Sequence, residues 1–186
     1  SSSLSLLLFA LAIVHAQTSS PYPPPDQVPP IDSPQVQAWL KEIDLTGAPD
    51  IPLRPGNPPG CVSNPVPDEC NWTCQKCPAD DLIDCSVPNT WGITFDDGPS
   101  TVTPSLLDYL KASNVPATFF LMGSNAAKYP ETLKRQVADG HHLASHTWSH
   151  HALTSLSNEQ IVAEMKWTEK VVLDHTGMRM KFMRPP

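Results

Sequence analysis

The chain has 186 residues, a formal net charge of −7 and 22 prolines, of which 16 precede residue 91. Residues 1–90 hold ten acidic and three basic side chains, whereas residues 91–186 hold nine of each. A neutral C-terminal part without a basic stripe excludes nucleic-acid binding as the expected function. The length fits one medium-sized domain with extensions.

The first residues have the pattern of a targeting segment. Leu4 to Val14 are apolar except for Ser5, and His15-Ala16-Gln17 follows. This pattern resembles a partial secretory signal peptide over residues 1–16, cleaved after Ala16. The run is too short for a membrane span, which needs about 20 apolar residues. We expect a protein secreted to the extracellular space or cell wall; a C-terminal membrane anchor in a longer protein stays open.

Residues 17–60 form a Pro-rich linker with a short helix. The prolines of residues 17–32 predict an extended, mobile segment. Ser33-Pro34 is typical of an N-cap and a first helical residue. Apolar side chains then recur at helical spacing, so this helix should rest one face on the later domain.

Residues 61–90 are rich in cysteine and few are apolar, so cross-links must replace a core there. In an oxidising compartment we expect disulfides rather than a zinc knot. The odd number leaves one free thiol or a partner outside the chain. Asn71-Trp72-Thr73 is an N-glycosylation sequon. The disulfide candidates are Cys61, Cys70, Cys74, Cys77 and Cys85.

Residues 91–186 alternate between strand and helix patterns, which predicts an α/β fold with a parallel sheet. Functional side chains of such sheets lie beyond the carboxyl ends of the strands. Strands are expected at residues 91–95, 117–122, 142–145 and 180–183, and helices at residues 104–113, 131–139 and 157–175. Since this pattern is too short to close a barrel, the domain over residues 91–186 is expected to be truncated.

The expected site combines groups from three strand ends. Asp96 and Asp97 end the first strand and point in different directions. His146 and His150, at i and i+4, would share one face of a helical turn. With Asp97 they make a common catalytic zinc set, and cobalt is a second option. The alternative interpretation is that Asp96 and Asp97 belong to an ordinary polar turn and that the His-rich loop is merely polar and binds no metal.

Three sequence motifs carry a family resemblance, and they are Thr-Phe-Asp-Asp-Gly-Pro-Ser, His-Thr-Trp-Ser-His and Arg-Pro-Pro. In order and spacing they resemble the first motifs of the polysaccharide deacetylases, carbohydrate esterase family four, with the NodB-homology domain. The segment from Cys61 to Asp97 resembles secreted, mushroom-type fungal chitin deacetylases. The resemblance implies the first half of a distorted (β/α) barrel, with a Pro-rich and Cys-rich N-terminal extension.

The resemblance also assigns roles, which are Asp96 as catalytic base, Asp97, His146 and His150 as metal ligands, and Arg184 as the residue that steadies the base. The family motifs that supply a general-acid His and an aromatic oxyanion donor are absent from this chain. His151 stands where relatives often have Pro, which makes it a competing ligand.

The implied function is metal-dependent hydrolysis of N-acetyl groups in chitin or chitin oligosaccharides, giving chitosan and acetate. Peptidoglycan deacetylase and acetylxylan esterase are alternatives from the same family. A non-catalytic protein that binds wall carbohydrate is the alternative from another class, because the Cys-rich and Pro-rich segments suit it. An intact set of metal ligands argues against a pure binder.

Overall fold

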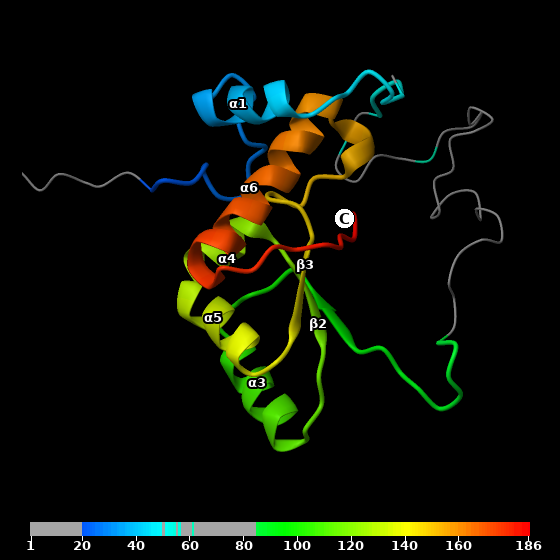
Figure 1. The fold of residues 1–186 in the computed structure, drawn as a ribbon, viewed down its shortest axis with the longest axis vertical. Helices are drawn as coiled ribbons and strands as arrows, with labels where there is room; N and C mark the ends of the chain where they lie inside the picture. Colours follow the sequence, from blue (N-terminus) through cyan, green and yellow to red (C-terminus); the bar gives the residue numbers. More distant parts are fainter. Residues whose placement is uncertain (1–19, 50, 55, 57–60, 62–84) are drawn as a thin grey trace, which may run out of the picture.

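The fold is built on a three-stranded parallel sheet of order β1-β2-β3, seen in a computed structural model (Figure 1). The structure describes residues 20–49, 51–54, 56, 61 and 85–186. The strands are β1 (Thr94–Asp96), β2 (Thr118–Leu121) and β3 (His142–Ser145). The helices are α1 (Pro34–Glu42), α3 (Thr103–Ala112), α4 (Gly123–Lys128), α5 (Pro130–Ala138), the 3-10 turn η1 (Leu153–Ser155) and α6 (Asn158–Thr176). The predicted α/β class with a parallel sheet is confirmed.

The register of the sheet aligns the three carboxyl ends. Asp96 pairs with Phe120, and Leu121 pairs with Ser145. Because all three strands run in the same direction, the segments that follow them emerge at one edge. This alignment brings residues about 50 positions apart in sequence to the same side of the molecule.

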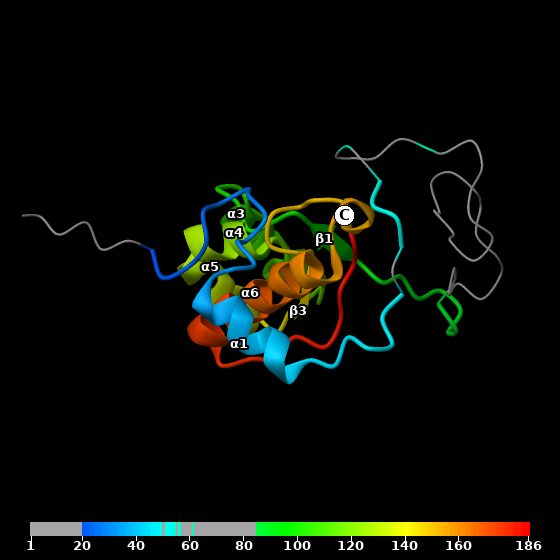
Figure 2. The same ribbon diagram turned by 90° about the horizontal axis from the view of Figure 1, so that it is seen from above.

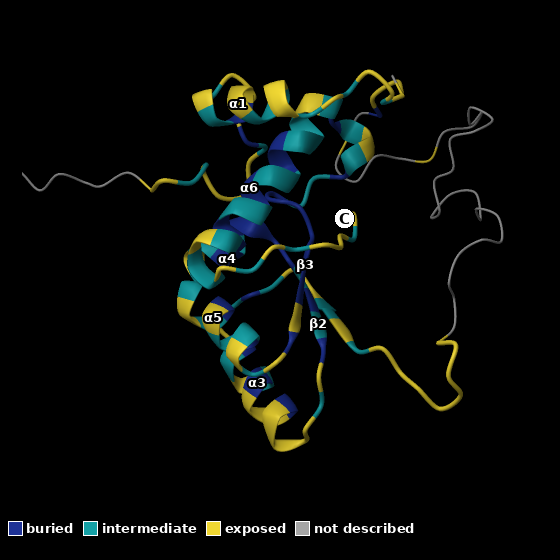
Figure 3. Cartoon of the chain, in the orientation of Figure 1, coloured by how far each residue is buried: buried dark blue, intermediate teal, exposed yellow. Residues whose placement is uncertain are grey.

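Helix α6 is the long central helix of the layer that covers the sheet (Figures 1 and 3). Ser157 and Gln160 form a capping box at its start, and Gly177 ends it in the left-handed conformation with φ of 73°. Its fully buried face includes Val171 and Val172. The helix therefore presents one side to the core and to the segments beyond the strands.

Several predicted boundaries were wrong. The first strand begins at Thr94 rather than Trp91, because its pairing with β2 begins at Thr94 opposite Thr118, and Trp91 is 85% exposed. The predicted fourth strand is reduced to one parallel bridge between Met183 and Ser145. Helix α3 begins at Thr103, one residue before the expected start. Helix α4 was not predicted, since its six residues show no apolar periodicity.

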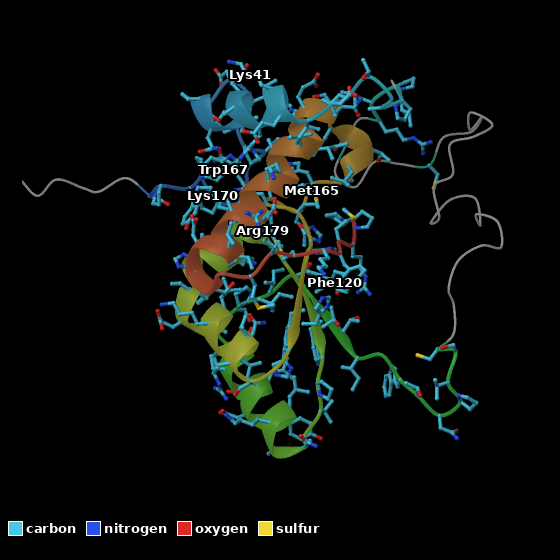
Figure 4. The ribbon with its side chains drawn as sticks, viewed as in Figure 1. Lys41, Phe120, Met165, Trp167, Lys170 and Arg179 are labelled. Carbon is cyan, nitrogen blue, oxygen red and sulfur yellow. The ribbon has the colours of Figure 1, made fainter. Side chains whose placement is uncertain are left out.

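The described part of the N-terminal extension packs on the domain, so the expectation of a mobile segment was wrong for residues 20–32. Tyr22 packs against the core, and the Pro24 carbonyl accepts a hydrogen bond of 3.1 Å from Trp148 Nε1. Helix α1 begins at the predicted Ser33 cap and lies beside α6 (Figure 2). There the Trp39 ring meets the Trp167 ring edge-on, with 5.2 Å between the ring centres. Trp167 is labelled on α6 in Figure 4.

Other expectations fall on residues that the structure does not describe. These are the signal peptide over residues 1–16, the sequon at Asn71, and Cys70, Cys74 and Cys77. Cys85 is described and is an exposed free thiol, so it is not a disulfide partner. The pairing of Cys61 with other cysteines stays a prediction. None of the helices that the structure describes is long and apolar enough to cross a membrane.

Gly123, the first residue of α4, gives a test of how closely α4 packs against α6 and the loop that follows β3. A Cβ atom there would lie 2.5 Å from Trp148 Cε3 and 2.7 Å from Thr168 Oγ1. Gly123→Ala should therefore lower the free energy of unfolding by about 1–3 kcal/mol, the usual effect of overpacking. Urea denaturation followed by tryptophan fluorescence measures it.

Gly92→Ala is the matched control, because a Cβ atom at Gly92 would meet nothing within 4 Å. Its unfolding free energy should stay within about 0.5 kcal/mol of the parent protein. Equal stability of the Gly123→Ala and Gly92→Ala proteins would contradict the packing described here.

Candidate metal centre and active site

Three predicted ligands converge at the carboxyl edge of the sheet. Asp97 follows β1 and His146 follows β3, and one ligand atom from each of these residues and His150 lies within 4.8 Å of the others. Asp97 Oδ1 is 3.3 Å from His146 Nε2 and 3.1 Å from His150 Nε2. The donor set is therefore two imidazole nitrogens and one carboxylate oxygen, which can hold a metal ion.

The two histidines do not lie on a helical turn, so that expectation was wrong. Thr147 and His150 have φ angles of 68° and 60°, in the left-handed region, and the segment between them is a loop. The His150 N–H donates to Thr147 Oγ1 at 3.2 Å, which closes the turn. A tight loop, rather than helical periodicity, brings the two imidazole rings together, with 5.0 Å between their centres.

The orientation of His146 leaves the correct nitrogen for a metal ion. Its Nδ1 lies 2.7 Å from the backbone carbonyl oxygen of Arg184. A carbonyl oxygen can only accept, so Nδ1 carries the hydrogen and Nε2 keeps its lone pair. His146 is buried, and its Nε2 points toward Asp97. This tautomer fits a metal ligand.

Asp96 is not a member of the ligand group and is held by Arg184. Arg184 Nη1 donates to Asp96 Oδ1 at 2.6 Å and to Thr94 Oγ1 at 3.2 Å. The guanidinium also lies 4.0 Å above the centre of the Phe120 ring. The expected pair is therefore in contact, and an aromatic ring that was not predicted supports it.

Two further residues that sequence reasoning missed hold the backbone around the ligands. Asn125 Nδ2 in α4 donates to the Asp97 carbonyl at 2.8 Å. Glu164 in α6 is fully buried and accepts hydrogen bonds from the loop that contains the two histidines. Burial raises the pKa of Glu164, and hydrogen bonds from Ser149 and Trp148 oppose this rise. The only sequence signal for Glu164 was its position as a polar residue on an apolar helix face.

The other histidines near the site have different partners. His151, the competing ligand of the sequence analysis, has its Nδ1 2.7 Å from Ser149 Oγ. His141 is buried, and its Nδ1 accepts from the Ala117 N–H at 3.2 Å. Burial lowers the pKa of His141, which favours a neutral structural ring. Neither residue belongs to the group of three ligand atoms.

Comparison with known proteins identifies relatives of similar sequence. Chitin deacetylase 1 of Cryptococcus neoformans var. grubii is 41% identical over 172 residues, covering 92% of this chain and 37% of the relative. Peptidoglycan-N-acetylglucosamine deacetylase PgdA of Listeria monocytogenes is 46% identical over 95 residues, covering 50% of this chain and 20% of the relative. The chain thus spans less than half the length of these relatives.

A solved structure supports the fold assignment. The structure described as a T48 deacetylase with substrate aligns with a TM-score of 0.50 and 45% identity, covering 51% of this chain and 48% of that chain. This agreement confirms the expected partial barrel of the deacetylase type. The sequence profile of the polysaccharide deacetylases matches residues 84–186. This chain therefore belongs to the polysaccharide deacetylase family.

Proposed function

We propose that the full-length protein hydrolyses the N-acetyl groups of N-acetylglucosamine units in chitin, releasing acetate and leaving chitosan. The observation that carries the proposal is the separation of two neighbouring carboxylates. Asp97 lies with His146 and His150, whereas Asp96 lies with Arg184. One side of the site can hold a metal ion while the other keeps a free carboxylate oxygen for a proton.

In this proposal Asp97, His146 and His150 hold one divalent transition metal ion, with zinc favoured and cobalt as the second option. When bound, such an ion lowers the pKa of a bound water and polarises a carbonyl oxygen. The hydrogen bond between His146 Nδ1 and the Arg184 carbonyl supports this role, because it keeps Nε2 free.

Asp96 acts as the general base in this proposal. One of its oxygens accepts a hydrogen bond from Arg184, which fixes the direction of the carboxylate. The other oxygen is then available to take the proton of the attacking water. Arg184 is a positioning residue, and the stacking of its guanidinium on Phe120 limits its motion.

Peptidoglycan or acetylxylan is the alternative substrate, because the described motifs surround the reacting group and not the rest of the polymer. The 41% identity to a fungal chitin deacetylase over most of the chain supports chitin. A non-catalytic wall-binding protein is less well supported, since binding alone requires neither the metal ligands nor Asp96. Secretion, glycosylation at Asn71 and disulfides among the other four cysteines remain parts of the proposal.

Replacement of the ligands tests the metal centre. His146→Ala and His150→Ala should each lose most of the bound metal, because either change removes one of three protein ligands. Metal content after dialysis, measured by mass spectrometry, checks this. His142→Ala is the control, because this exposed histidine of β3 is outside the ligand group. Normal metal content in both ligand variants would rule out the assignment.

Asp96→Asn tests the base. The amide keeps the shape of the side chain but cannot take a proton, so acetate release from chitin oligosaccharides should fall by about 10²–10⁴-fold. Metal content should stay normal, because Asp96 is not among the ligands. An Asp96→Asn protein with full activity would falsify the base assignment.

The substrate is tested by acetate release from matched amounts of chitin oligosaccharides, peptidoglycan and acetylxylan. The proposal expects kcat/KM to be highest on chitin oligosaccharides. A higher value on either other polymer would reassign the substrate within the family. Binding to chitin without acetate release from any of the three would favour the non-catalytic alternative.

A further inference from the structure

The loop that carries both histidines rests on one buried carboxylate. Glu164 has no exposed surface, and its Oε2 accepts from the backbone N–H groups of Trp148, at 2.7 Å, and Ser149, at 2.8 Å. Its Oε1 accepts from Ser149 Oγ. A single side chain from α6 therefore satisfies two consecutive peptide groups and one hydroxyl of the loop.

These two peptide groups lie between the residues with unusual backbone geometry. Thr147 and His150 both have positive φ angles, and for β-branched Thr147 this conformation is rare. Such conformations persist only where the surrounding structure imposes them. The carboxylate of Glu164 binds the Trp148 and Ser149 N–H groups, which are the two donors between the strained positions.

Helix α4 holds the carbonyl oxygens of the same two peptide groups but leaves their N–H donors to Glu164. The carbonyl oxygens of Thr147 and Trp148 accept from the Gly123 and Ser124 N–H groups of α4 at 2.9 and 3.1 Å. On the far side, Ser149 Oγ also lies 2.7 Å from His151 Nδ1, which orients the hydroxyl. His151 thus belongs to the support of the loop.

We propose that Glu164 is a positioning residue of the metal centre, which holds the loop in the shape that aims His146 Nε2 and His150 Nε2 at one ion. This inference rests on the proposed metal-binding function. It goes beyond the ligand set, because Glu164 touches neither the ion nor the substrate. Residues of this kind typically change metal affinity by about 10–100-fold when replaced.

The chemistry of the replacement distinguishes hydrogen bonding from packing. Glu164→Met fills a similar volume but leaves the Trp148 and Ser149 N–H groups without an acceptor. Glu164→Gln keeps one oxygen that can accept from both, although bonds to a neutral oxygen are weaker than those to a carboxylate. The affinity for metal should therefore fall in the order parent, Glu164→Gln, Glu164→Met.

The experiment is a competition titration of zinc between each protein and a chromophoric chelator, in parallel with urea denaturation of the metal-free proteins. Glu164→Met should weaken zinc binding by at least about tenfold, and Glu164→Gln by about threefold. The matched control is Thr168→Val, since Thr168 is buried one turn further along α6 and its hydroxyl donates to the Glu164 carbonyl. It should lose stability but keep the parent affinity for zinc.

Each outcome decides one point. Parent-like zinc affinity in folded Glu164→Met overturns the inference, and so does an equal loss of affinity in Thr168→Val, which would show a general effect of stability. If Glu164→Met does not fold, the Glu164→Gln protein decides, and parent-like affinity there overturns the inference. Failure of the parent protein to bind zinc, cobalt or another divalent metal would instead overturn the proposed function on which this inference rests.

Discussion

The parallel register of β1, β2 and β3 is the constraint on which the site depends. It places the carboxyl ends of all three strands at one edge, so that Asp97 after β1 meets His146 after β3. The same alignment places Phe120 of β2 beside Asp96, under the guanidinium of Arg184. A shift of one residue in either pairing would turn these side chains to the opposite face of the sheet.

The sheet alone does not orient the histidines, because the loop after β3 has a strained backbone. Its shape is imposed by neighbours from distant parts of the chain. Helix α6 supplies Glu164, α4 approaches closely through Gly123, and the N-terminal extension accepts a hydrogen bond from Trp148 at Pro24. The extension that the sequence presents as a linker is thus part of the support of the candidate metal centre.

Sequence patterns predicted which side chains form the candidate site better than they predicted the contacts that hold those side chains in place. The Asp96-Asp97 pair and the two histidines were found because strand ends of a parallel sheet must meet at one edge. The helical turn was wrong because spacing of i and i+4 does not distinguish a helix from a loop with positive φ angles. Glu164 and Phe120 were missed because their roles depend on tertiary contacts between segments that no local pattern connects.

The central claim is that one metal ion binds to Asp97, His146 and His150 while Asp96 stays free of it. Anomalous X-ray diffraction from crystals of the metal-loaded protein, at the absorption edge of that metal, tests this most directly. The account predicts one anomalous peak bonded to these three side chains, with Asp96 still paired to Arg184. A peak bonded to Asp96 or His151, or no peak between the three side chains, would contradict it.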